Sequence, residues 1–257
     1  MANKLKALLA RKEPAIGSWI GFADPFSVEI MADAGFDWLM VDTEHCPIGP
    51  ETLCRILISM KGGTSSPVVR LPSNSPDAFK MALDLGADGV VVPMINSAAD
   101  AAQAVRHCRY PPVGARGFSP IRASNYFRDL ENYARQAGQE IALVIQIETP
   151  AAVANIGEIL AVDGIDGVFI GPSDLSSFMG FRGRTDAPEV QQVVSSVMAA
   201  AVTKGIPCGL PTWSANECLD FIRRGALLLT LGGDLHYLSA GARSEIACMR
   251  EMLLRNR

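Results

Sequence analysis

The chain has 257 residues, of which 49% are hydrophobic and 19% are charged. This balance is typical of a globular protein and excludes a disordered or fibrous chain. The net charge of -4 offers no basic face to a phosphate backbone, so we expect a small-molecule ligand and no nucleic-acid partner. The length fits one domain over residues 1–257.

The sequence favours a cytoplasmic protein without a membrane span. Residues 1–12 carry four basic side chains around a short apolar stretch, but no long apolar core or cleavage site follows, so we expect an opening helix. No uninterrupted apolar run reaches about 18 residues, the length needed to span a bilayer. The six cysteines form no CxxC pair, which indicates free thiols in a reducing compartment.

Short β-branched apolar runs alternate with longer amphipathic segments along the whole chain. This alternation is typical of a parallel sheet with crossover helices. Eight strands are predicted, at 15–20, 37–41, 67–71, 89–92, 142–147, 167–170, 206–210 and 227–231. Eight such units predict an α/β protein with a (β/α)8 barrel fold.

The predicted helices have recognisable starts and stops. Asp24, Ser75 and Thr149 each precede a proline, as a capping residue does at a first helical turn. The helices should stop at glycines that turn the chain into the next strand, namely Gly35, Gly86, Gly164, Gly205 and Gly225. The stretch 110–139 is too long for an ordinary connection, which predicts a functional loop.

Two carboxylates are predicted to meet at the carboxyl ends of neighbouring strands, the face where barrels of this kind carry their sites. Alternation puts Gln146 and Glu148 on the inward side of one strand, and Asp174 follows the next strand. Oxygen ligands with room for water suit Mg²⁺ or Mn²⁺. Alternatively, Asp174 caps the following helix and Glu148 pairs with Arg70.

His45 follows a predicted strand in the segment Val-Asp-Thr-Glu-His-Cys, beside Asp42 and Glu44. A neighbouring carboxylate can fix the imidazole tautomer and tune its pKa, so His45 is a candidate for proton transfer, although loop histidines are as often plain surface residues. His107, in an amphipathic helix, and His236 are interpreted as structural.

Two further groups at strand ends are candidates for binding an anion. Arg70 ends the run Pro-Val-Val-Arg, and its guanidinium can face a carboxylate or an oxyanion, or serve structure alone. Gly171, Pro172 and Ser173 precede a helix whose free amides can hold a substrate carboxylate; a plain strand-to-helix turn is the alternative. Trp19 is the polar residue at the end of the first strand.

Other kinds of catalysis are disfavoured by what the sequence lacks. The lysines all fall in helices or outer loops, which argues against an imine-forming aldolase. There is no phosphate-binding P-loop and no GxGxxG turn for a dinucleotide. Cys46 lacks a nucleophile signature and is interpreted as a packed thiol.

Taken together, these segments resemble a known family. The motifs are Phe36-Asp37-Trp38 to Asp42 with Glu44-His45, Pro67 to Arg70, Val92-Pro93-Met94, Tyr110-Pro111-Pro112, Arg116-Gly117, Gln146-Ile147-Glu148-Thr149 and Gly171-Pro172-Ser173-Asp174-Leu175-Ser176. They resemble the HpcH/HpaI family of class II pyruvate aldolases, which includes 4-hydroxy-2-oxoheptanedioate and 2-dehydro-3-deoxyglucarate aldolases. The resemblance runs from about Ile16 to the C-terminus.

The resemblance implies a metal-dependent lyase that cleaves 4-hydroxy-2-oxo acids into pyruvate and an aldehyde. Glu148 and Asp174 would bind Mg²⁺ or Mn²⁺, with Co²⁺ as an alternative, and Gln146 would support them. The metal would stabilise a pyruvate enolate that Arg70 contacts. His45, oriented by Asp42 within one chain or across a subunit boundary, would move a proton through water.

The resemblance also implies pocket residues and an assembly. Trp19 would line the pocket, and the unusual segment from Leu210 to Trp213 would shape the acceptor side. The loop from Phe118 to Arg122 is shorter than in the family, which leaves the aldehyde unidentified. A homo-hexamer, a dimer of trimers built by exchange of the last helix, is expected.

Two other functions remain open at this point. The same enolate chemistry would serve an oxaloacetate decarboxylase or a carbon-carbon bond-forming enzyme similar to macrophomate synthase. A barrel that has lost catalysis and acts as a binding protein is a further alternative, since a fold does not guarantee a function.

Overall fold

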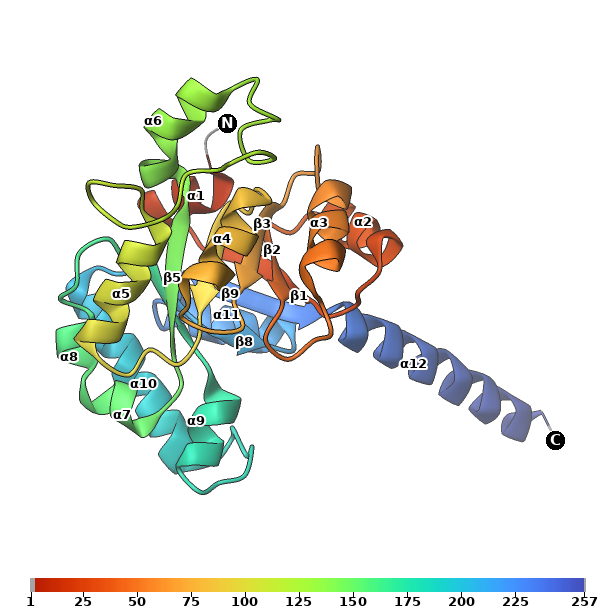
Figure 1. Ribbon diagram of the computed structural model, residues 1–257. Coiled ribbons are helices and arrows are strands. Elements are labelled where there is room, and N and C mark those ends of the chain that lie inside the picture. The colour runs from red at the N-terminus through yellow and green to blue at the C-terminus, as the bar shows by residue number, and fades with distance from the viewer. Residues whose placement is uncertain (1–2, 257) are drawn as a thin grey trace.

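A computed structural model, which describes residues 3–256, shows a parallel barrel of nine short strands surrounded by helices (Figure 1). The strands follow the order β7-β6-β5-β4-β3-β2-β1-β9-β8. They are β1 Ala15–Ile20, β2 Trp38–Asp42, β3 Ser66–Arg70, β4 Gly89–Val92, β5 Ala142–Ile147, β6 Gly167–Ile170, β7 Cys208–Gly209, β8 Pro211–Thr212 and β9 Leu228–Gly233. The predicted (β/α)8 barrel is confirmed.

The barrel closes through a strand that sequence patterning predicted as one piece. Residues 206–210 were expected to form a single strand, but β7 pairs with β6 while β8 pairs with β9. Only Leu210 separates these two pieces. Pro207 and Pro211 bracket the segment and cannot donate backbone hydrogen bonds, so the ladder on each side is short. This interruption turns the predicted eight strands into nine.

The helices begin and end largely where the sequence indicated. Asp24, Ser75 and Thr149 accept backbone hydrogen bonds at the starts of α2, α4 and α7. All five predicted stop glycines have positive φ, the conformation that glycine adopts without strain. The helices are α1 Lys4–Ala10, α2 Pro25–Asp33, α3 Pro50–Ser59, α4 Pro76–Asp84, α5 Ala98–Cys108, α6 Leu130–Glu140, α7 Pro150–Ala154, α8 Ile156–Ile159, α9 Pro172–Phe178, α10 Pro188–Lys204, α11 Ala215–Arg223 and α12 Asp234–Arg255.

Alternating side chains divide the core into two layers. Leu39 and Val41 of β2 point outward and pack under the helices, whereas Trp38 and Met40 point into the barrel. The interior also holds Phe169, whose ring meets Trp38 edge to face with centroids 6.2 Å apart. This inner layer fills the lower barrel, so the inward residues above it face an open end.

The long stretch 110–139, which was expected to be functional because of its length, lies away from that open end. Its last part is a helix, α6, and Arg122 donates hydrogen bonds to the carbonyls of Leu57 and Leu85, at the last turns of α3 and α4. Helices of a βα unit end at the amino side of the sheet, so the loop from Phe118 to Arg122 covers the amino end. In this chain it contributes nothing to the opposite face.

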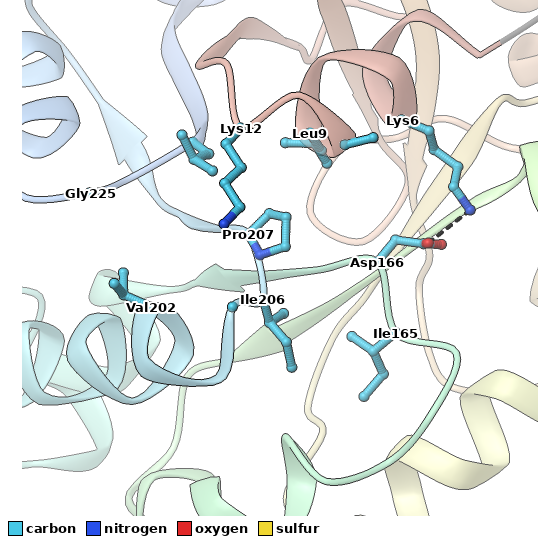
Figure 2. Close-up of a pocket in the computed structure, with 12 residues that line it drawn as sticks. Lys6, Leu9, Lys12, Ile165, Asp166, Val202, Ile206, Pro207 and Gly225 are labelled. Atoms are coloured by element: carbon cyan, nitrogen blue, oxygen red, sulfur yellow. Dashed lines mark ion pairs between the residues drawn. The ribbon is translucent and has the colours of Figure 1, made fainter.

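The amino end also carries a cavity. About 510 Å³ of space lies between α1 and the end of α10, lined by residues that include Leu9, Lys12 and Pro207 (Figure 2). Lys6 on its edge pairs with Asp166 at 2.8 Å. None of the predicted site residues lines this space, so its size alone does not make it the site.

The last helix, α12, projects from the barrel as an arm (Figure 1). Its first residue, Asp234, is buried, but the side chains further along are exposed. Ile246, Met249 and Leu253 are each about half exposed and share one face of the helix. Among residues 3–256, no helix has the length and apolar character required to cross a bilayer.

Barrel closure should be sensitive to a single methyl group at Gly209. A Cβ at this position would lie 1.4 Å from the backbone oxygen of Leu228, which cannot move aside without displacing β9. We expect Gly209→Ala to lower the free energy of unfolding by about 3 kcal/mol or more, measured by urea denaturation. Gly138→Ala is the control, since its Cβ would meet nothing within 4 Å. Equal stability of the two variants would contradict this role.

Candidate active site

The polar residues predicted at the strand ends do converge, because strand periodicity points them inward. Trp38, Met40 and then Asp42 alternate into the barrel along β2, and the same spacing brings Arg70 inward at the end of β3. Asp42 and Arg70 are direct neighbours in the β2-β3 register. Their side chains therefore meet above the apolar interior.

Arg70 is held in place from three sides. Its guanidinium donates to both carboxylate oxygens of Asp42, at 3.0 and 2.7 Å, and lies 3.2 Å from Glu44. The same group stacks over the Trp19 ring, 4.6 Å from its centroid. All of these contacts leave a fixed, buried positive charge at the mouth of the barrel.

Glu148 is buried just past the end of β5. One carboxylate oxygen accepts a hydrogen bond from the amide of Met94 at 2.7 Å, and the other accepts from the side chain of Gln146. Gly171 makes room for it, since a Cβ there would lie 2.7 Å from the carboxylate. Arg70 pairs with Asp42 and Glu44, so the alternative of a Glu148–Arg70 pair is not observed.

Negative charge accumulates around Glu148. Burial raises its pKa, and the charges of Glu44 and Asp174 raise the pKa further against the opposing hydrogen bond from Met94. Burial also raises the pKa of Glu44, an effect that Arg70 opposes. Asp174 makes no capping hydrogen bond at the start of α9, contrary to the alternative reading of it as a cap. These carboxylates lack a full complement of positive charge.

The carboxylate and amide oxygens around Glu148 fit a hard divalent cation, although the number of these ligands is small. Within residues 3–256, no cluster of three or more His, Cys, Asp or Glu side chains is positioned to hold a metal ion. Glu148 and Asp174 offer two carboxylates, and Gln146 adds a buried Oε1 that has no hydrogen-bond partner among the described residues. Oxygen ligands that leave positions for substrate and water are typical of Mg²⁺ and Mn²⁺ sites.

His45 lies at the edge of the site with its side chain about 58% exposed. Its Nε2 is 3.8 Å from the Glu44 carboxylate, the only acidic partner given by the geometry of the described residues. Asp42 accepts a hydrogen bond from the His45 backbone amide at 3.2 Å and does not contact the ring. The expected orientation of the imidazole by Asp42 is therefore not present in this chain; Glu44 is the nearer carboxylate.

Most of the predicted site residues surround one cavity of about 280 Å³ at the carboxyl ends of the strands. They are Trp19, Asp42, His45, Arg70, Gln146, Gly171, Pro172, Ser173 and Asp174. Two predicted residues do not line it. Glu148 lies beneath Gly171, in contact with Gln146, and Leu210 is buried in the core between β7 and β8.

Further residues line the cavity. Pro211 begins β8 and Trp213 follows it, within the segment that was expected to shape the acceptor side. Sequence reasoning missed Asp234, Leu235 and His236, which begin α12. His236 was interpreted as structural, but it lies on the cavity wall, 5.5 Å from the Trp213 ring between centroids. The rule that strand ends carry the site, applied to the last strand, would have found this group.

Comparison with known proteins agrees with this geometry. The model of the HpcH/HpaI aldolase/citrate lyase family matches residues 15–240. The chain belongs to this family. Its resemblance to HpcH/HpaI aldolases is thus confirmed, and so is the expectation of a carbon-carbon lyase.

Relatives support the assignment over nearly the whole chain. A 5-keto-4-deoxy-D-glucarate aldolase of Salmonella arizonae is 38% identical, over 93% of each chain. A solved HpcH/HpaI aldolase/citrate lyase family protein of Burkholderia cenocepacia has a TM-score of 0.93 at 31% identity, covering 97% of this chain and 100% of the other. Macrophomate synthase, with a TM-score of 0.87 at 22% identity over 99% and 90% of the chains, shares the fold.

The Asp42–Arg70 ion pair should make the free energy of unfolding depend on pH in the acidic range. Burial raises the pKa of Asp42, but the hydrogen bonds and charge of Arg70 outweigh burial and hold the pKa below its usual value of 3.8. The stabilisation is thus present above that value and is lost as pH falls through the lower, folded pKa. We expect Asp42→Asn to lower the free energy of unfolding by about 3 kcal/mol at pH 7, and by less near pH 3.

Urea denaturation from pH 7 to pH 3 checks this dependence. The control is Asp77→Asn, which removes an exposed partner of Lys80 and should change little at either pH. A deficit of Asp42→Asn that stays constant over the whole range would contradict the assigned charge state.

Proposed function

We propose that this family member is a divalent-metal-dependent aldol lyase that cleaves 4-hydroxy-2-oxo acids into pyruvate and an aldehyde. The observation that carries the proposal is the buried carboxylate of Glu148, with Asp174 and the unpartnered Gln146 oxygen beside it. The names of the curated relatives, which are 5-keto-4-deoxy-D-glucarate aldolases, support the reaction class and suggest a substrate derived from a sugar acid.

Glu148 and Asp174 would hold Mg²⁺, Mn²⁺ or Co²⁺, with Gln146 in support. Bound there, the cation supplies a Lewis acid that favours the enolate of pyruvate. A buried carboxylate whose pKa is raised by burial and by like charges is disfavoured as an anion, so a nearby cation relieves it. Ser173 lies on the cavity wall in the first turn of α9, where backbone amides lack helical acceptors and can bind the substrate carboxylate.

The remaining side chains would stabilise the developing negative charge and transfer a proton. When the C3–C4 bond of the substrate breaks, its electron pair stays on C3 and spreads onto the C2 oxygen, which the fixed guanidinium of Arg70 stabilises. The proton of the 4-hydroxyl leaves through water to His45, whose exposed ring borders the cavity. Asp42 supports the stabilisation of the C2 oxygen by fixing Arg70, and Trp19 supports the same guanidinium by stacking.

The proposed cation site makes a direct prediction. Glu148→Gln keeps the shape of the side chain but removes its charge, so metal binding and enolate formation should both suffer. We expect kcat/KM for pyruvate release to fall at least about 100-fold, with an unchanged circular dichroism spectrum. Ser195→Ala, on the outer surface of α10, is a control that should keep full activity.

The same preparation tests metal dependence and the competing reactions. Exhaustive chelation should abolish turnover of the wild type, and added Mn²⁺ should restore it. Activity that survives both chelation and Glu148→Gln would contradict the proposal.

Carbon dioxide release from oxaloacetate, without pyruvate release from any hydroxy-oxo acid, would identify a decarboxylase instead. Product formed from pyruvate, without the reverse cleavage, would identify a bond-forming enzyme.

We further propose that the protein is a cytoplasmic homo-oligomer, with α12 exchanged between subunits of a hexamer. The apolar face of Ile246, Met249 and Leu253 supports this, because an isolated helix that exposes such a face leaves apolar area in water. The six free cysteines fit a reducing compartment.

Removal of the arm tests the assembly. Truncation after Gly241 deletes that apolar face while keeping the buried Asp234 at the base of the helix. We expect light scattering after size exclusion to show a smaller assembly for the truncated chain than for the full chain. Glu245→Gln, a mild exposed change on the same helix, should leave the mass unchanged. Equal masses for the full and truncated chains would contradict the role of α12.

A further inference from the structure

One wall of the cavity consists of two exposed aromatic rings that the proposed bond cleavage does not use. Trp213 follows β8, and His236 lies in the first turn of α12. Their ring centroids are 5.5 Å apart and the planes are tilted by 56°. Both residues line the 280 Å³ cavity, although they come from different βα units.

The backbones of both residues are anchored while their rings stay exposed. The Trp213 amide donates to the Glu217 carboxylate at 2.7 Å, and Ser214 caps α11 immediately after it. Upstream of His236, the carboxylate of Asp234 accepts hydrogen bonds from the amides of Gly21 and Phe22, each at 2.9 Å. Yet Trp213 is 56% exposed, so core packing does not account for its place.

The order of strands places this wall across the barrel from the residues assigned to the 2-oxo acid. Arg70 and Gln146 belong to β3 and β5, whereas Trp213 and His236 follow β8 and β9, which lie on the other side of the closed sheet. A substrate whose carboxylate and keto group sit beside Arg70 and Gln146 therefore extends its far end toward the two rings.

Resting on the proposed function, we infer that Trp213 and His236 bind the aldehyde fragment of the substrate and select a hydroxylated chain. An indole face packs against C–H groups of such a chain and removes its own apolar area from water. An imidazole both donates and accepts hydrogen bonds, as vicinal hydroxyls require. The pair thus suits a polyol-like tail better than a purely aliphatic one.

A matched pair of acceptors tests this selectivity. In the direction of bond formation, pyruvate is offered with D-glyceraldehyde or with propanal, which have the same carbon count but differ in hydroxyls. We expect His236→Ala to lower the ratio of kcat/KM for glyceraldehyde over propanal about 10-fold, because it removes the hydrogen-bonding partner. Trp213→Ala should raise KM for both aldehydes about 10-fold, with a smaller change in kcat.

Conservative variants and a control variant distinguish loss of aldehyde binding from a general effect of the substitutions. Trp213→Phe and His236→Gln should recover most of the wild-type values, since each retains the relevant ring or hydrogen-bonding group. Tyr126→Ala removes a similarly exposed ring, at 53%, from the loop at the amino end and should leave both aldehydes unaffected.

Failure of this inference differs from failure of the proposed function. If the wild type joins pyruvate to no aldehyde, the aldol lyase assignment is wrong and this inference is wrong with it, whether or not oxaloacetate is decarboxylated. If the wild type is active but neither alanine variant alters the glyceraldehyde-to-propanal ratio or the aldehyde KM, the lyase assignment stands and the two rings do not bind the aldehyde.

Discussion

Excess buried negative charge at the open end of the barrel is the constraint on which the rest of the site depends. Asp42 and Glu44 pair with a single guanidinium, that of Arg70, which Asp42 already neutralises through two hydrogen bonds, while Glu148 and Asp174 add further negative charge nearby. Burial and neighbouring carboxylates raise the pKa values of Glu44 and Glu148, so these two side chains are disfavoured as anions unless further positive charge is present. Under the proposed function, a divalent cation held by Glu148 and Asp174 would supply this charge.

The barrel tolerates this concentration of charge because stability and function depend on residues at opposite ends of the barrel. Below the site, Trp38, Phe169 and the other inward side chains fill the interior, and α1 covers the amino end. Above it, the inward positions at the carboxyl ends of β2, β3 and β5 carry the polar side chains of Asp42, Arg70 and Gln146. Stability thus resides in the lower layers, while the upper layer carries residues that would weaken a core.

The cavity has two halves that present different chemical groups. The half beside β3, β5 and β6 presents charged and amide groups suited to a carboxylate and a keto oxygen. The half beside β8 and α12 presents rings whose backbones are anchored by Glu217 and Asp234. The base of α12 therefore lines the cavity, while the apolar face further along the helix is exposed.

The sequence by itself determined the barrel, the helix caps, the stop glycines and the residues at most strand ends, because period-two alternation and local turn chemistry are encoded by neighbouring residues. Tertiary structure decided which side chains touch. In the folded chain Asp42 contacts Arg70 and not the ring of His45, and Leu210 divides the predicted seventh strand. The loop from Phe118 to Arg122 lies at the amino end, and His236 lies beside Trp213. Such contacts join residues distant in the chain, and only the closing of the sheet sets their geometry.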